Sequence, residues 1–77
     1  MLTRDDLCPW ILDALRRNNR RATILQVAKD IWDHHASELQ ASGDLLYKWQ
    51  YDMRWAAQKL RDARKLRHSN KGVWELV

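Results

Sequence analysis

The stretch LYKWQYDMRWAAQKLRDARKLRHSNKGVWEL, residues 46–76, changes its hydrophobic period once, and this change decides the predicted fold. Up to residue 65, apolar residues recur three and four positions apart, which is the spacing of one face of an α-helix. Beyond it they alternate with polar residues in two short segments that flank the turn sequence SNKG. We therefore predict a helix over residues 46–65 followed by a two-stranded β-hairpin over residues 66–76.

A helical wheel at about 100° per residue divides the predicted helix into two faces. The apolar face predicts a stripe packed against the core, and it contains Leu46, Trp49, Met53, Ala56, Ala57, Leu60 and Ala63. The other face combines hydrogen-bond donors with positive charge and is called the donor strip below. It contains Gln50, Arg54, Gln58, Arg61 and Lys65.

The N-terminal part of the chain predicts a first helix and a short strand. Thr3 or Asp6 can cap the helix, and Pro9 falls in its first turn, where a missing N–H costs little. The polar stretch 18–21 breaks the apolar pattern and indicates a turn. A two-residue strand over 21–22 is then placed to pair with the hairpin.

A second helix is predicted after Thr23. Thr23 and Gln26 have the spacing of a capping box, in which each side chain bonds the backbone of the other residue. The helix is expected to end near residues 41–43, where Gly43 can take the left-handed conformation. Its expected core face contains Ile24, Val27, Ala28, Ile31, Trp32, His35 and Leu39.

Three helices followed by a two-stranded hairpin is the element order of a winged helix-turn-helix, a mainly α fold with a small β part. The chain shows no internal repeat, linker or low-complexity segment, so we expect residues 1–77 to form a single domain. Among the five tryptophans, Trp32, Trp49 and Trp74 are expected in the core. The pattern assigns Trp10 and Trp55 to neither core nor surface.

A binding domain is expected rather than an enzyme. The 77 residues leave room for one small domain, and they contain no nucleophile–base spacing, glycine-rich phosphate loop or paired-carboxylate motif. We therefore predict no catalytic residue, no cofactor and no small-molecule substrate. His34, His35, Cys8 and His68 do not supply the three or four ligands of a zinc site, so no metal is predicted.

The expected location is the cytoplasm, and the nucleoid if the domain binds DNA. The single cysteine allows no intrachain disulfide, and no apolar run approaches the ~18 residues of a membrane span, so no membrane association is predicted.

Positive charge is concentrated in the second half of the chain. Residues 1–44 hold six basic and seven acidic residues, a net charge of −1, whereas residues 45–77 hold eight basic and three acidic residues, a net charge of +5. Such an asymmetry is typical of a domain that binds a polyanion. A solvated basic surface is the alternative that charge alone leaves open.

Four short matches to a known family run through most of the chain: PxILxxL over residues 9–15, SG at 42–43, RWAxxxLxxAxxL over 54–66 and GVWxL over 72–76. With these residues the chain resembles the N-terminal domain of Mrr-type restriction proteins and related helix-turn-helix modules of restriction and chromatin proteins. The resemblance implies a winged-helix fold that binds double-stranded DNA. The nuclease domain that usually follows in that family has no match here, so no nuclease activity is implied.

One departure from the family concerns the end of the third helix. The family commonly has glycine after the residue that corresponds to Ala63, whereas this chain has Arg64. A non-glycine residue in the left-handed conformation costs roughly 1 kcal/mol. We therefore expect the helix to run further before it turns.

The donor strip and the hairpin are the predicted DNA-binding surface. Gln50 and Arg54 lie in the N-terminal part of the helix, where base edges are usually reached, and Arg61 and Lys65 are expected to meet phosphate. Cations at a helix C-terminus also complement the helix dipole, which explains Arg64 and Lys65 but not Arg54. The full predicted set is Gln50, Arg54, Gln58, Arg61, Lys65, Arg67, Asn70 and Lys71.

The arginines at 16, 17, 20 and 21 form a further basic group, for which a helix cap is favoured over a phosphate clamp. A protein-binding domain, as a homodimer, adaptor or small inhibitor, is the alternative function. It would use a partner surface of Trp10, Tyr51 and Trp55, because Trp and Tyr are frequent interface anchors. For Trp55, packing beneath the hairpin or between the second and third helices is favoured over exposure.

Overall fold

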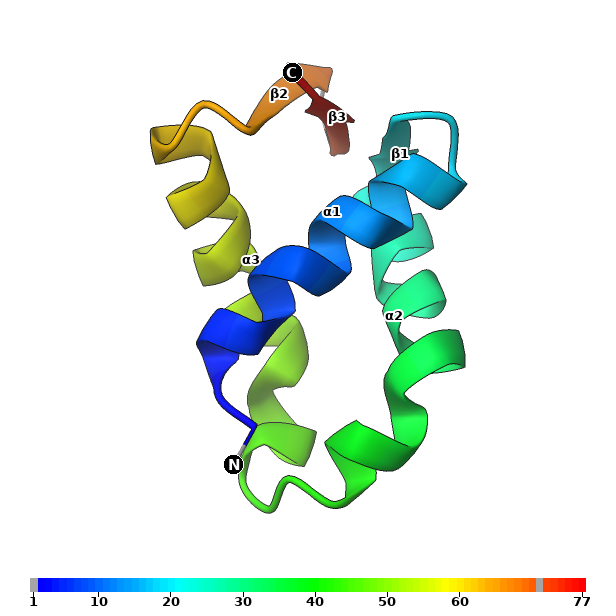
Figure 1. The fold of residues 1–77 in the computed structure, drawn as a ribbon, viewed down its shortest axis with the longest axis vertical. Helices are drawn as coiled ribbons and strands as arrows, with labels where there is room; N and C mark the ends of the chain where they lie inside the picture. Colours follow the sequence, from blue (N-terminus) through cyan, green and yellow to red (C-terminus); the bar gives the residue numbers. More distant parts are fainter. Residues whose placement is uncertain (1, 71) are drawn as a thin grey trace.

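The computed structural model describes residues 2–70 and 72–77, and within them it is mainly helical with a small antiparallel sheet. In Figure 1, α1 crosses in front of α2 and α3, the sheet closes the upper end, and the N-terminus lies beside the α2–α3 connection. The elements are the 3₁₀ turn η1 (Arg4–Asp6), α1 (Leu7–Arg17), β1 (Arg21–Thr23), α2 (Ile24–Gln40), α3 (Leu45–Asp62), β2 (Leu66–Asn70) and β3 (Val73–Leu76).

The hairpin is part of a three-stranded sheet. The strand order is β1-β3-β2, and β3 is antiparallel to both neighbours. Trp74 on β3 pairs with Ala22 on one side and with His68 on the other. The short strand predicted at residues 21–22 is therefore confirmed, and it extends to Thr23.

The core lies between α1, α2, α3 and the inner face of the sheet. The apolar stripe predicted for α3 is largely confirmed, since Trp49, Met53, Ala56, Ala57 and Leu60 are buried. The stripe is wrong at its two ends: Leu46 is half-buried beside an open groove, and Ala63 is exposed because α3 has already ended. Asp52, which the prediction did not place in the core, is also buried on α3.

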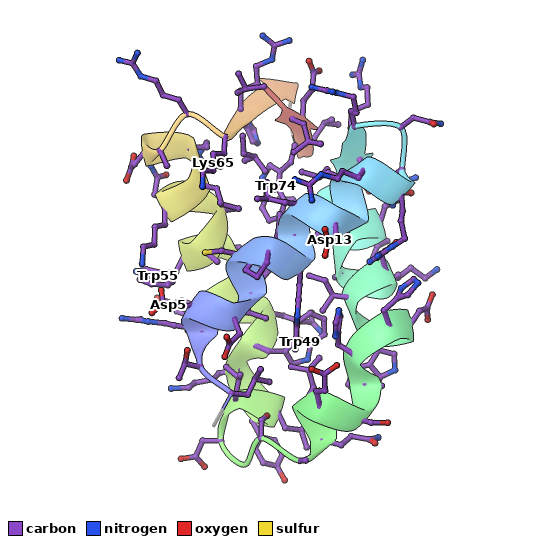
Figure 2. All side chains as sticks on the ribbon, in the orientation of Figure 1. Asp5, Asp13, Trp49, Trp55, Lys65 and Trp74 are labelled. Atoms are coloured by element: carbon purple, nitrogen blue, oxygen red, sulfur yellow. The ribbon has the colours of Figure 1, made fainter. Side chains whose placement is uncertain are left out.

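The distribution of the tryptophans differs from the expectation. Trp10 is 8% exposed and stacks on His35 with ring centroids 3.7 Å apart, so it belongs to the core. Trp32 was predicted in the core, and this is wrong, because the side chain is 38% exposed. It lies on the flank of the apolar face of α2 and is covered on one side by the ring of Trp49, at a centroid distance of 6.3 Å. Trp49 and Trp74 point into the interior, as predicted (Figure 2).

The capping box predicted at the start of α2 is confirmed, whereas Asp6, at the N-cap of α1, makes no side-chain cap bond. The Gln26 N–H donates to Thr23 Oγ1 at 3.1 Å, and the Thr23 N–H donates to Gln26 Oε1 at 2.8 Å. At the N-terminus the Thr3 N–H donates to Asp6 Oδ2 at 2.8 Å and so starts the turn η1. Gly43 takes a φ of +68° after the last turn of α2, which confirms the predicted helix stop.

The third helix ends earlier than expected. It stops at Asp62, and Arg64 takes the left-handed conformation with a φ of +60°, so the prediction of a longer helix is wrong. The Arg64 N–H donates to the Arg61 carbonyl and the Lys65 N–H to the Leu60 carbonyl, both at 3.0 Å. These two bonds form a Schellman motif, which satisfies free carbonyls at the helix end and offsets the strain at a position that favours glycine.

Replacing Arg64 by glycine is expected to stabilise the domain by about 1 kcal/mol, because glycine adopts this backbone conformation without a Cβ penalty. For a domain of this size, that gain raises the melting temperature by about 4–8 °C. Thermal unfolding followed by circular dichroism measures the shift. Lys65→Gly is the matched control, since it removes a neighbouring charge at an ordinary φ and is expected to give no gain. A melting temperature lowered by R64G would contradict the assignment.

Candidate nucleic-acid interface

The donor strip occupies the outer face of α3 over most of its predicted length. Gln50, Arg54 and Gln58 are exposed, and Arg61 is half-buried. Arg61 Nη2 donates to Gln58 Oε1 at 2.5 Å, and Gln58 Nε2 donates to Asp62 Oδ1 at 3.0 Å. Gln58 is thus held within α3. Arg54 has no hydrogen-bond or ion-pair partner among the residues that the structure describes.

The structure brings the donor strip and the hairpin together. Arg54 and Arg61 from α3 and His68 from β2 line one pocket, whose other lining residues are Ile24 and Trp74. We call it the α3–hairpin pocket. The Ile24 N–H donates to the Gly72 carbonyl at 3.0 Å, so the turn of the hairpin is tied to the first residue of α2. One surface therefore combines two arginines, a histidine and the end of the hairpin.

An open groove between α2 and α3 continues from this surface. Most of its lining residues are apolar, and Lys29, Asp33 and Gln50 add polar groups. The groove is lined by Leu25, Ala28, Lys29, Trp32, Asp33, Leu46, Trp49 and Gln50. A smaller pocket beside it includes both Gln50 and Arg54 and thereby joins the α2–α3 groove to the α3–hairpin pocket. The same face of the molecule thus presents polar donors beside an apolar groove.

Lys65 does not lie on the donor strip, and its predicted place there is wrong. The left-handed Arg64 turns the chain after α3, so Lys65 no longer follows the helical wheel. It lines a separate pocket on the α1 side together with Arg16, Arg20 and Arg64. Figure 2 shows Lys65 at the end of α3 on the side that faces α1.

In the hairpin, Arg67 forms a cross-strand ion pair with Glu75, its register partner on β3. Its Nε donates to Glu75 Oε1 at 3.1 Å. Side chains of successive strand residues point to opposite faces, so Arg67 and His68 project to different sides of the sheet. The predicted contacts through Lys71 and through the side chain of Asn70 lie outside the described residues.

Several other cations are neutralised by carboxylates in the folded chain. Arg17 forms an ion pair with Asp30 of α2, and this hydrogen bond raises the pKa of the arginine. Lys59 Nζ lies 2.8 Å from Asp5 Oδ1, and that hydrogen bond likewise raises the pKa of the lysine. The arginines at 16, 17, 20 and 21 do not act as one group, because Arg17 turns to α2 whereas Arg16 and Arg20 line the pocket of Lys65.

The predicted partner surface of Trp10, Tyr51 and Trp55 is not formed, because Trp10 is buried. Trp55 packs, as favoured, but against the N-terminal segment instead of the predicted places. The guanidinium carbon of Arg4 lies 4.0 Å from the ring centroid, and Lys59 Nζ lies 5.2 Å from it. Figure 2 shows Trp55 beside Asp5 at the edge of the molecule. Tyr51 is 74% exposed.

One exposed aromatic residue on the outer face of α3 was not singled out from the sequence. Tyr47 is 87% exposed at the start of α3. Its position on the helical wheel coincides with the donor strip, so the wheel itself contained the signal.

Neither a metal centre nor a membrane-spanning helix is found within residues 2–70 and 72–77. In this part of the chain no three side chains of His, Cys, Asp or Glu come together in a way that suits a metal ion. None of its helices is both long and apolar enough to cross a membrane.

Comparisons with known proteins find no matching family model, no matching curated protein and no matching solved structure.

Proposed function

We propose that the chain is a winged helix-turn-helix domain that binds double-stranded DNA and carries no catalytic activity. In this proposal α3 enters the major groove with Gln50 and Arg54 toward the base edges. The hairpin β2–β3 is the wing and lies along the backbone or in the minor groove. The order of the elements and the resemblance to the N-terminal domain of Mrr-type restriction proteins support the same class.

The observation that carries the proposal is that the arginines of the α3–hairpin pocket are not paired with carboxylates among the described residues. Arg54 has no partner among the described residues, and Arg61 bonds only a neutral amide through its side chain. In contrast, Arg17, Lys59 and Arg67 each pair with a carboxylate. Two arginines without a carboxylate partner, beside an anchored hairpin, suit a phosphate backbone and the acceptor edge of guanine.

The proposal predicts salt-dependent binding to duplex DNA of any sequence. Each phosphate neutralised by the protein contributes about −0.9 to the slope of log K against log salt, so four contacts give a slope of about −3.6. Fluorescence anisotropy with a labelled random-sequence duplex, titrated at several salt concentrations, measures this slope. The absence of binding at the lowest ionic strength would refute the proposal.

A protein-binding function is the second candidate, and one observation favours it. Leu25 is 68% exposed and Trp32 is 38% exposed, and both line the α2–α3 groove. Tyr47, near the start of α3, is 87% exposed. Large apolar and aromatic side chains of this kind anchor protein interfaces. Sedimentation analysis of the free chain over a range of concentrations separates the two candidates. Dimerisation that is lost in W32A, together with no duplex binding, would favour the second.

A further inference from the structure

A second basic pocket lies on the α1 side of the molecule and shares no lining residue with the α3–hairpin pocket. Its cationic rim consists of Arg16, Arg20, Arg64 and Lys65, and all four side chains are exposed. Its floor is apolar and consists of Leu12, Leu76 and Val77. We call it the α1 pocket.

Two of the three rim arginines occupy backbone positions that favour glycine. Among the described non-glycine residues, positive φ values occur at Asn19 (61°), Arg20 (72°) and Arg64 (60°). Residues with a Cβ are disfavoured in this region, and where they persist they are concentrated at functional sites. Both arginines line the same pocket, so the two turns place two strained cationic residues side by side.

The rim retains an excess of positive charge. Arg64 and Lys65 form no ion pair with any carboxylate that the structure describes. Arg16 Nη1 lies 2.7 Å from Asp13 Oδ1, an exposed pair that adds one negative charge beside the pocket. Arg20 Nη2 donates at 3.0 Å to a backbone oxygen of Val77, which in the 77-residue chain belongs to the α-carboxylate. Four cations and two carboxylates, those of Asp13 and of the last residue Val77, therefore surround an apolar floor, and positive charge remains in excess.

A cationic rim around an apolar floor suits an acidic peptide better than it suits the phosphate backbone of a duplex. The phosphate backbone of a duplex would satisfy the rim but would leave the floor formed by Leu12 and Leu76 unfilled. An extended peptide that carries an aliphatic side chain between acidic residues satisfies both, because the aliphatic group covers the floor and the carboxylates meet the guanidinium groups. The chemistry of the pocket therefore favours an acidic peptide.

We propose that the α1 pocket binds an acidic peptide segment of a partner protein, with an aliphatic side chain on Leu12 and Leu76 and carboxylates on Arg16, Arg64 and Lys65. The proposal does not depend on DNA binding, since the two pockets share no residue. In the sheet, the α1 pocket contains Leu76 of β3, whereas the α3–hairpin pocket contains Trp74.

The test uses the whole chain and a synthetic peptide with the sequence EDELEDE as the probe. Peptide is titrated into ¹⁵N-labelled protein, and we expect amide shifts at Leu12, Lys65 and Leu76 but not along the donor strip. R64G/K65Q is expected to weaken binding about tenfold, since it removes two charge-assisted contacts. The peptide EDESEDE, which lacks the aliphatic group, is expected to bind more weakly than the parent.

Two controls keep the outcome interpretable. R64G relieves backbone strain, so thermal unfolding is expected to show a folded double variant, and a loss of binding then reports on charge. R54Q/R61Q removes the same number of charges on the other face and is expected to bind the peptide as the parent chain does. Three results would overturn the proposal. The peptide could shift amides of the donor strip alone, or both double variants could lose peptide affinity equally. The third is that a duplex shifts the amides of the α1 pocket while the peptide does not.

Discussion

Replacing Arg54 by glutamine is expected to weaken binding to the preferred duplex by about 1–3 kcal/mol and to relax the base preference at one position. Arg54 is exposed on α3 and has no partner in the described part of the chain, so its guanidinium group is available to a base edge. Glutamine is shorter and uncharged and cannot reproduce the bidentate contact with guanine. Selection of bound sequences from a random library, for the parent chain and for R54Q, measures both effects.

Arg61→Gln is expected to act differently. Arg61 is half-buried beside His68 and two turns further along α3, where a phosphate contact is expected. Loss of one phosphate contact weakens binding to all duplexes alike and reduces the salt slope by about 1. Lys65→Gln is the matched control: it removes one charge from the other side of the molecule and is expected to leave the slope nearly unchanged. If R54Q, R61Q and K65Q changed the affinity, the base preference and the salt slope in the same way, the proposed roles would be contradicted.

Replacing Trp74 by alanine is expected to cost about 3–5 kcal/mol of folding free energy. Trp74 is 2% exposed and lies on the central strand, opposite both Ala22 and His68. Its removal leaves a cavity where the sheet meets the helices. Domains of this size have little stability in reserve, so W74A is expected to be largely unfolded at 25 °C or to melt far below the parent chain.

Urea unfolding followed by far-ultraviolet circular dichroism measures this loss. Tyr47→Ala serves as the control, because Tyr47 is 87% exposed and its truncation is expected to change stability by no more than about 0.5 kcal/mol. W74A is also expected to abolish duplex binding, since Trp74 lines the α3–hairpin pocket and helps to position β2. A W74A variant as stable as Y47A would show that this core assignment is wrong.

The sequence by itself predicted those elements whose signals lie within a few residues of one another. The Thr23–Gln26 capping box, the turn after α1 and the change of period after α3 all act over such distances, and the structure contains each of them. The core stripe of α3 followed in the same way from helical spacing. The positions of Gln50, Arg54, Gln58 and Arg61 on one outer face were predictable for this reason.

The tertiary structure decided which residues on the edge of a predicted face are covered. Trp10 and Trp32 both flank apolar faces, but Trp10 stacks on His35 and is buried, while Trp32 stacks on Trp49 and stays 38% exposed. Helical spacing states the direction in which a side chain points and contains no information about how closely the neighbouring helix approaches. Trp55 likewise finds its cover in Arg4, more than 50 residues away in the chain.

Ion pairs and the direction of the chain after α3 were also decided by tertiary structure. Lys59 meets Asp5, and Arg67 meets Glu75, because strands and turns bring these charges together. Local propensity predicts that Arg64 avoids the left-handed conformation, whereas a sheet packed on α1 requires the chain to turn there. The strained turn therefore moves Lys65 from the donor strip to the α1 pocket. The sequence determined the elements and the donor strip of α3, while their packing determined which cations share a surface.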